Sequence, residues 1–388
     1  MLIVALIALV NMLGYGIIIP ILYGYSKKFG LSDFENGILF AIFSICQFFA
    51  TPIIGRLSDK YGRRPLLLIS ILGTAGSFFL MAIAPNAWFL LIARALDGLT
   101  AGNIPVAFAV ISDSTKPEER PRAFGIIGAA FNFGFVFGPA IAAFTVGIGQ
   151  AVPFLIAGGI TLVAVVLTWL YLPETNTHMG EAQHGKLFDF RRLWRTLFDP
   201  NVGMTFLISL CFFLAFSCAI IYGFQPYTIN VLKLTPSQNS YMFTLFGAIG
   251  LISQTFLVQR FSRKFGMKKS FTIGLLSTSL AFLLMFASNG ILYLFILAMV
   301  LIAVCNSIVQ PLIPAILSQE ADAKSQGTIM GLNTSYQSIG MIIGPILGGA
   351  VATVSIPLTF LIGSILVLVS FFLSFKVLRP GLKKESAF

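Results

Sequence analysis

Charged side chains are scarce in this 388-residue sequence: they make up 10% of its residues, whereas soluble domains carry about 25%. The four cysteines lie in apolar stretches without metal-ligand spacing, and the two histidines, His178 and His184, share one polar segment. The sequence also has no phosphate-binding glycine loop with a lysine and no nucleophile spaced with a base. These absences exclude an ordinary water-facing globule and argue against an enzyme, a metal centre and an ATP-driven pump.

Hydrophobic residues, by contrast, make up 57% of the chain and occur in long runs. A helix needs about 20 apolar residues to cross a bilayer. Twelve such spans are expected, at residues 2–23, 36–55, 66–84, 88–112, 123–146, 151–172, 203–227, 238–258, 270–287, 291–317, 327–351 and 356–377. The first run has no basic segment before it and no cleavage site, so we interpret it as a span and not as a signal peptide.

Basic residues are distributed unevenly over the predicted connections. Of the 25 lysines and arginines, Lys27, Lys28 and Lys233 follow odd-numbered spans and Arg94 lies inside a span, whereas all others follow even-numbered spans or end the chain. By the positive-inside rule, both termini are expected in the cytoplasm. The net charge of +11 therefore reflects membrane topology and indicates no nucleic-acid partner.

The chain contains an internal repeat. The sequence GRLSDKYGRRP at 55–65 recurs, with changes, as QRFSRKFGMKK at 259–269, and GFVFGPAIAA at 134–143 recurs as GMIIGPILGG at 340–349. Together with the spans, the repeat predicts an all-α membrane protein of twelve transmembrane helices in two pseudo-symmetric six-helix bundles. The predicted parts are an N-terminal bundle, a cytoplasmic linker, and a C-terminal bundle with a short tail, at 1–172, 173–200 and 201–388.

The linker contains an amphipathic pattern. Apolar positions recur with helical spacing, while arginines occupy the other face; the apolar residues are Phe190, Leu193, Trp194, Leu197 and Phe198, and the arginines are Arg191, Arg192 and Arg195. This pattern predicts a helix lying in the membrane interface. A partner-binding segment is the alternative.

The first repeat motif, in the connection after the second span, resembles the loop signature of the major facilitator superfamily, which it meets at Gly55, Leu57, Asp59, Gly62, Arg63 and Arg64. The resemblance covers essentially the whole chain. Two further stretches, ISDSTKPEERPRAFG at 111–125 and LGYGIIIPIL at 13–22, are similar to the drug:proton antiporter branch and its tetracycline-exporter-like members. The resemblance implies a secondary transporter in a bacterial inner membrane that works by alternating access.

The connection after the second span is also a candidate gate. Asp59 is expected to accept hydrogen bonds from helix N-terminal amides or to pair with Arg63, Arg64 or Arg122. The resemblance implies that the cluster closes the cytoplasmic side in the outward-facing state, and its members are Gly55, Asp59, Gly62, Arg63, Arg64, Asp113 and Arg122. A solvated loop that only sets topology is the alternative.

Glycines in the fifth and eleventh spans recur four residues apart, each pair followed by a proline. Such a pair allows a neighbouring helix to approach closely, and the proline permits a bend. The residues are Gly134, Gly138, Pro139, Gly340, Gly344 and Pro345. The first set is similar to the motif associated with antiporters, although plain helix packing explains the glycines as well.

Arg94 and Asp97 lie in the middle of the fourth span, where a charge costs about 3 kcal/mol on insertion scales. Being three residues apart, they share a helical face and can pair. In one interpretation, a proton or a cationic substrate competes for the carboxylate as the cavity opens to either side. In the other, the pair is a permanent ion bridge between the fourth helix and the first. Arg94 matches the basic residue of the superfamily's fourth-span motif, of which Asp97 is no part.

Amides within the spans are further cavity candidates, because an unpaired polar group in a bilayer must bond across helices or face water. They are Asn11, Gln47, Asn132, Gln225, Asn306, Gln310, Asn333 and Gln337. Asn11 is also a departure from the resembled branch, whose members often carry an acid there. Aromatic residues are candidates for an apolar pocket, namely Phe131, Phe135, Phe212, Phe216, Tyr222, Phe224 and Tyr227.

These observations predict proton-coupled efflux of small lipophilic or cationic compounds by a transporter that uses the proton gradient and no cofactor. The expected partners are a small-molecule substrate, protons and the lipid bilayer, with the chain acting as a monomer. A proton-independent facilitator or an importer of a small metabolite remains the alternative, and the uncharged Asn11 favours it.

Overall fold

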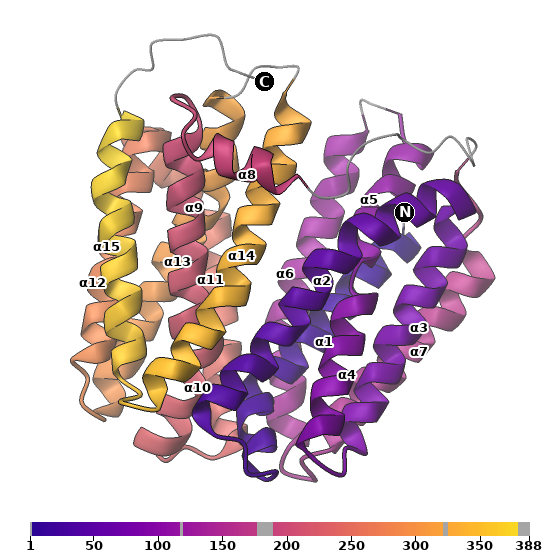
Figure 1. The fold of residues 1–388 in the computed structure, drawn as a ribbon, viewed down its shortest axis with the longest axis horizontal. Coiled ribbons are helices and arrows are strands. Elements are labelled where there is room, and N and C mark those ends of the chain that lie inside the picture. The colour runs from indigo at the N-terminus through magenta and orange to yellow at the C-terminus, as the bar shows by residue number, and fades with distance from the viewer. Residues whose placement is uncertain (1, 117–118, 177–188, 321–324, 379–388) are drawn as a thin grey trace. The chain divides into compact units, whose positions relative to one another are not determined.

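The computed structural model describes residues 2–116, 119–176, 189–320 and 325–378. Within these residues, twelve helices are long and apolar enough to cross a membrane (Figure 1). The prediction of an all-α protein with twelve spans is therefore confirmed. The linker histidines His178 and His184 lie outside the described residues.

The N-terminal spans are built from seven helices. These are α1 (Leu2–Lys27), α2 (Asp33–Tyr61), α3 (Arg63–Ala82), α4 (Ala87–Thr100), α5 (Asn103–Ser114), α6 (Arg120–Thr145) and α7 (Val152–Tyr171). The predicted span at 88–112 is confirmed as Ala87–Ser114, and within it the helix is interrupted between α4 and α5. Pro105 lies in the first turn of α5, where it has no N–H to continue the helical hydrogen bonds from α4.

The C-terminal spans follow a short helix, α8 (Phe190–Thr196), which is the amphipathic helix expected in the linker. The seventh span runs through α9 (Gly203–Phe216), η1 (Ser217–Gly223), α10 (Phe224–Pro226) and η2 (Tyr227–Val231). The others are α11 (Pro236–Phe265), α12 (Met267–Phe286), α13 (Leu292–Glu320), α14 (Gln326–Ala352) and α15 (Leu358–Leu378). The η segments are π-helical, and Pro226, which lacks an N–H donor, lies between them.

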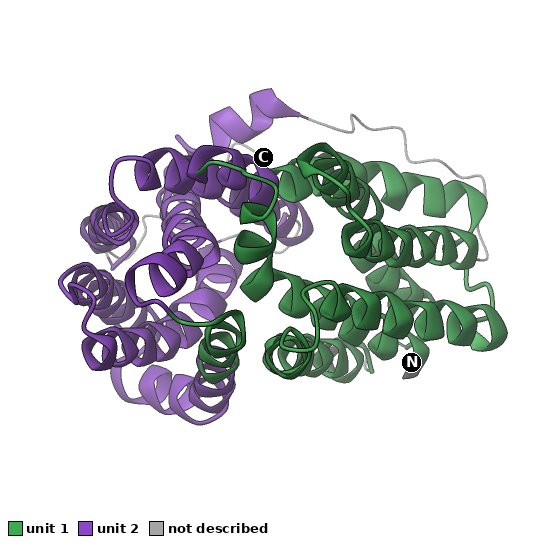
Figure 2. Ribbon diagram, turned by 90° about the horizontal axis from the view of Figure 1, so that it is seen from below, with its two compact units in different colours: residues 1–32, 42–187, 234–245 green, residues 33–41, 188–233, 246–388 purple. Residues whose placement is uncertain are grey.

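Contacts divide the chain into two compact units (Figure 2). Unit 1 comprises residues 1–32, 42–187 and 234–245, and unit 2 comprises residues 33–41, 188–233 and 246–388. The units thus exchange the ends of two long helices relative to the predicted bundles: the first turns of α2 pack with unit 2, and those of α11 pack with unit 1. In unit 2, the Tyr222 hydroxyl donates to the carbonyl of Asp33 over 2.6 Å.

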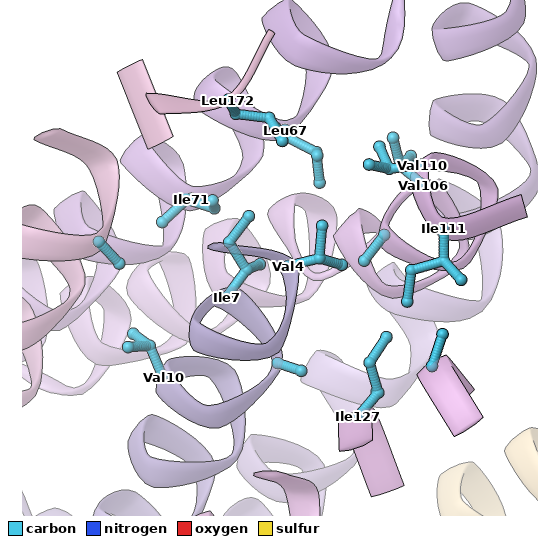
Figure 3. Close-up of a cluster of buried hydrophobic side chains, with 14 residues drawn as sticks. Val4, Ile7, Val10, Leu67, Ile71, Val106, Val110, Ile111, Ile127 and Leu172 are labelled. Atoms are coloured by element: carbon cyan, nitrogen blue, oxygen red, sulfur yellow. The ribbon is translucent and has the colours of Figure 1, made fainter. Parts of the chain in front are cut away.

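The core of unit 1 is a tightly packed aliphatic cluster (Figure 3). Side chains from α1, α3, α5 and α6 meet there, and Val4, Ile7, Leu67, Ile71 and Val106 are each at most 1% exposed. Residues four apart on one helix face, such as Leu67 and Ile71, supply the contact surface of α3. This core fixes α1 against the elements that carry the site described next.

Candidate functional site

Arg94 and Asp97 form a buried ion pair in α4 of unit 1. Nη1 of Arg94 lies 2.8 Å from Oδ2 of Asp97, and the two residues are 2% and 5% exposed. The three-residue spacing places both side chains on one face of the helix. Among the described residues, Nε of Arg94 has no hydrogen-bond partner, so the guanidinium is not fully satisfied by the protein.

Three other side chains surround this pair. The guanidinium carbon of Arg94 lies 4.6 Å from the ring centre of Phe43 in α2, a cation–π distance. Tyr15 of α1 contacts the Phe43 ring, with 5.9 Å between the centroids, and interacts electrostatically with both members of the pair. The Ser77 hydroxyl of α3 is a hydrogen-bonding neighbour of the Asp97 carboxylate. The pair therefore lies where α1, α2 and α3 converge on α4.

Local sequence explains how α4 reaches this position. Asn86 caps the helix, because its side chain accepts a hydrogen bond of 2.9 Å from the Phe89 N–H. Gly98, directly after Asp97, lets α2 approach closely. A β-carbon at this position would collide with the carbonyl of Phe43. The glycine next to Asp97 thus brings the Phe43 ring over the Arg94 guanidinium.

Asn11 of α1 pairs with Asn103 at the start of α5. Each amide donates to the other, over 3.0 and 3.1 Å. Both partners are neutral, so this contact carries no charge. The two residues are 92 positions apart in the chain, so the sequence identified Asn11 as a candidate but did not identify its partner Asn103.

The other amides of the predicted cavity are scattered. Asn333 is buried in unit 2 and accepts a hydrogen bond of 2.8 Å from the Ser209 hydroxyl. Gln225 is buried in α10. Half-buried positions are occupied by Gln47, Asn132, Asn306 and Gln337, and Gln310 is exposed. Within each unit, the described contacts do not join these amides into one site.

Most aromatic residues expected to line a pocket belong to the core of unit 2 instead. Phe212, Tyr222, Phe224 and Tyr227 are at most 2% exposed. Tyr227 stacks on Phe295 with 4.9 Å between the ring centres. These rings hold the seventh span in place, whereas Phe131, Phe135 and Phe216 are half-buried.

The candidate gate is a network centred on Arg63 at the start of α3. Its guanidinium pairs with Asp59 in the last turn of α2 and, over 3.1 Å, with Asp113 at the end of α5. It also donates to the Ser58 hydroxyl over 2.7 Å. These contacts tie three helix ends together within unit 1.

Arg64 and the remaining gate residues take different positions. The Arg64 guanidinium donates to the carbonyl of Trp169 near the end of α7. Arg122 is exposed on α6, and a β-carbon at Gly55 would meet nothing within 4 Å. Of the three arginines considered for Asp59, the structure selects Arg63.

Glu174, which the sequence did not single out, caps the N-terminus of α3. Its carboxylate accepts the N–H groups of Arg63 and Arg64 over 2.8 and 3.1 Å. Of the two roles expected for Asp59, the structure shows the pairing with an arginine, Arg63, whereas the helix N-terminal amides are bound by Glu174. Gly62 joins the two helices at φ 102°, and a β-carbon there would lie 2.5 Å from Glu174.

The pKa of Glu174 is below its ordinary value. Partial burial raises the pKa of this carboxyl, but the backbone N–H groups of Asn176, Arg63, Arg64 and Thr175 together outweigh that effect and lower it. The ionised form of Glu174 is therefore stabilised, as expected for an anion at a helix N-terminus. In the sequence, Glu174 is marked only as a glutamate just after the sixth span.

The paired glycines are sites of close helix approach in both units. A β-carbon at Gly134 would lie 2.8 Å from the Leu13 nitrogen, and one at Gly138 would lie 2.8 Å from Cα of Gly16, so α6 packs directly on α1. In unit 2, Gly340 and Gly344 take the same role against the seventh span. The prolines that follow, Pro139 and Pro345, lie inside α6 and α14.

Comparison with known proteins extends over the whole chain. The Major Facilitator Superfamily model matches residues 4–253 and again 205–388. The chain is 32% identical over 379 residues to multidrug resistance protein 1 of Bacillus subtilis (strain 168), covering 96% of this chain and 95% of that protein. It is 30% identical over 366 residues to the class B tetracycline resistance protein of Escherichia coli, covering 91% and 88%.

A solved structure supports the same fold. The crystal structure of a bacterial homolog of the human lysosomal transporter Spinster superimposes with a TM-score of 0.81 at 16% identity, covering 98% of this chain and 97% of that one. With twelve apolar helices, these matches describe an integral, multi-pass membrane transporter of the drug-efflux type. The chain belongs to the Major Facilitator Superfamily, in the branch of the multidrug and tetracycline resistance proteins.

Proposed function

We propose that this protein exports small lipophilic or cationic compounds in exchange for protons, by alternating access of its two bundles. We place it in a bacterial plasma membrane, as a monomer with both termini in the cytoplasm. The observation that carries the proposal is the buried pair of Arg94 and Asp97. Every other acid in a described span lies near an end of that span, whereas Asp97 lies well inside the span Ala87–Ser114 and is therefore the acid near mid-membrane.

Exchange needs one carboxylate for which a proton and a substrate compete. When Asp97 takes up a proton, Arg94 loses its ionic partner and keeps the Phe43 ring as its neighbour. When the proton leaves, the carboxylate becomes available to a cationic substrate or to Arg94 again. Because protonation leaves Arg94 without its ionic partner and deprotonation restores the pair, the two protonation states are favoured in different arrangements of the surrounding helices.

The surroundings of the pair favour an amphipathic substrate. Phe43 and Tyr15 provide aromatic faces next to an acid, and such faces attract organic cations. The described spans of unit 2 offer hydroxyls, amides and apolar side chains, which suit an uncharged or lipophilic body. This combination does not suit a sugar phosphate or a polyanion, because Arg94 is the only cation of the described spans that lies away from their ends.

The decisive experiment is gradient-driven transport in proteoliposomes. The purified protein is reconstituted into liposomes and a pH gradient is imposed. Uptake of the fluorescent cation ethidium into these proteoliposomes is then followed. Asp97→Asn keeps the shape of the side chain but cannot titrate, so uptake driven by the gradient is expected to fall to the level of empty liposomes. Glu35→Gln, which removes one exposed carboxylate at the end of a span, is the matched control and is expected to retain it.

A proton-independent facilitator is the second candidate, and the neutral contact between Asn11 and Asn103 favours it. That contact occupies the place where an additional proton carrier would be expected from the resemblance. The same assay separates the two, because a facilitator equilibrates ethidium at equal rates with and without the gradient. Wild-type uptake that ignores the gradient, or an Asp97→Asn variant that still follows it, would contradict proton exchange through Asp97.

A further inference from the structure

The short helix α8 presents two exposed stripes of different chemistry. Phe190, Trp194 and Phe198 follow one another every fourth residue and are 58%, 67% and 71% exposed. Arg191 and Arg195 form the adjacent stripe and are also exposed. Large aromatic side chains beside arginines are typical of a helix lying at a membrane surface.

The remaining face of α8 is fixed to α14 of the same unit. Thr196 is 1% exposed, and its hydroxyl lies 2.6 Å from the hydroxyl of Tyr336. Tyr336 in turn donates to the carbonyl of Leu193. In Figure 1, α8 lies crosswise over the ends of α9 and α14. Its orientation is therefore set by the bundle, and the two stripes face away from it.

A pocket of about 660 Å³ lies beside the arginine stripe, between α8 and the start of α9. Arg191, Arg192 and Arg195 line it together with two acids. Both acids accept hydrogen bonds from backbone amides: Asp189 accepts the Arg192 N–H over 2.9 Å, and Asp199 accepts the N–H groups of Asn201 and Val202, just before α9. The three guanidinium groups outnumber the two carboxylates, so the lining carries a net positive charge.

The position of the pocket relative to the bilayer decides which anion it fits. The span that contains α9 begins at Gly203, only a few residues after α8 ends, so the pocket lies at the level of lipid headgroups. An aromatic stripe that enters the headgroup region next to three arginines matches a lipid with an apolar body and a negative head.

We propose that α8 and this pocket bind the headgroup of an anionic phospholipid, in the leaflet on the side of the basic connections. Tyr336 fastens α8, and with it this pocket, to α14, the helix that also carries Asn333 and Gly340. Neither the transported substrate nor proton coupling enters this proposal, so its test is independent of the proposed function.

Tryptophan fluorescence tests the proposal directly, because the chain has three tryptophans. Trp88→Phe and Trp169→Phe leave Trp194 as the only one. The protein is reconstituted in phosphatidylcholine containing either brominated phosphatidylglycerol or brominated phosphatidylcholine. We expect stronger quenching by the anionic lipid at equal mole fraction, and we expect added salt to reduce the difference.

Neutralising the arginines provides the specific test. Arg191→Gln, Arg192→Gln and Arg195→Gln together are expected to raise the phosphatidylglycerol fraction for half-maximal quenching at least about fivefold, the effect of a single cation near a charged membrane. The matched control neutralises three exposed cations of α11, with Arg260→Gln, Arg263→Gln and Lys264→Gln, and is expected to behave like the parent.

Two results would overturn the proposal. Equal quenching by both lipids in the parent would show that α8 lies at the bilayer without selecting anions. Absence of quenching by either lipid would show that α8 does not touch the membrane, and the stripes would then belong to a protein partner. Circular dichroism and gel filtration of each variant establish that loss of quenching does not come from misfolding.

Discussion

The two units use the same position of the internal repeat for different chemistry. Counted from the proline that marks equivalent places, Pro105 and Pro311, the positions of Arg94 and Asp97 correspond to Val300 and Ala303 in α13. Unit 1 thus has an ion pair where unit 2 has apolar side chains. The helices differ accordingly: the fourth span is interrupted between α4 and α5, whereas α13 is one continuous helix.

Several polar contacts between the spans of unit 2 join neutral side chains. Ser279 and Ser364 each donate to the other's carbonyl, over 2.9 and 2.8 Å, and Ser209 donates to Asn333. Neutral pairs of this kind stabilise helix packing without responding to a proton. The difference teaches that titration can be confined to one unit while the other provides a rigid frame.

The largest effect is expected from placing an acid in α13 at the position that corresponds to Asp97, where unit 2 has an apolar side chain. Ala303 is 1% exposed, so Ala303→Asp buries a carboxylate without a partner, which costs about 3 kcal/mol at mid-membrane. We expect a strong loss of folded protein, measured by fluorescence-detected gel filtration after heating. Adding Val300→Arg supplies the partner and is expected to recover part of the loss.

An uncharged control sharpens this result. Ala303→Asn introduces a side chain of similar size without charge, and its cost is expected to be smaller. Equal losses for the aspartate and the asparagine would show that volume, and not charge, distinguishes α13 from α4.

A smaller loss of stability is expected when the paired glycines are substituted. This loss should be similar in the two units. Gly344→Ala places a β-carbon 2.8 Å from the Leu214 carbonyl, and overpacking of this kind costs about 1–3 kcal/mol. Gly138→Ala meets Gly16 at the same distance and is expected to cost a similar amount. Gly250→Ala is the control, because nothing lies within 4 Å of its β-carbon, and thermal unfolding in detergent compares the three.

The helix after the repeat motif is capped in unit 1 by Glu174, whereas in unit 2 the residue before α12 is Gly266, which has no side chain to cap the helix. Glu174→Ala removes the acceptor of two helix N-terminal amides and is expected to cost about 1 kcal/mol. Thermal unfolding of this variant, with Glu119→Ala as a control at another exposed acid near a helix start, measures the difference. A wild-type melting temperature for Glu174→Ala would show that water replaces the cap without loss.

The contribution of Glu174 is expected to depend on pH in one direction. Because folding lowers the pKa of this carboxyl, the stabilisation is fully present above the ordinary carboxyl pKa and is lost as the pH falls through the lower, folded pKa. The melting temperatures of the wild type and Glu174→Gln should therefore differ at neutral pH and converge in acid. A difference that grows in acid would contradict this sign.

The smallest effect is expected at the equivalent cluster of unit 2. Lys268 lies 3.5 Å from Glu320 and donates to the Val377 carbonyl over 2.8 Å, and it is partly exposed. Lys268→Gln is expected to cost less than about 1 kcal/mol. Arg63→Gln, which removes contacts to two acids and a serine, should cost more in the same unfolding assay. Equal effects would remove the distinction between the two clusters.

Features that depend on residues close in the chain could be predicted from the sequence. The ion pair of Arg94 with Asp97 and that of Asp59 with Arg63 join residues three and four apart, and helical geometry alone brings such residues together. Contacts between distant segments could not be predicted. The cap of Glu174 on α3 depends on where α7 ends relative to α3, which no local pattern contains.

The aromatic residues of the seventh span show the same limit. Their abundance indicated a pocket, but helix rotation decides whether a ring faces a cavity or a neighbouring helix, and Tyr227 faces Phe295. The π-helical turns around Pro226 change that rotation within the span, so a regular period of 3.6 residues cannot assign its faces.

Hydrophobic run length determined the twelve spans, charge asymmetry gave the expected orientation, and repeated motifs revealed the two halves, because each of these properties is written along the chain. Tertiary structure alone decided that Asn11 pairs with Asn103, that Phe43 covers Arg94, and that Glu174 caps α3. Those contacts depend on the register between helices, which close packing at small residues fixes only after the helices have assembled.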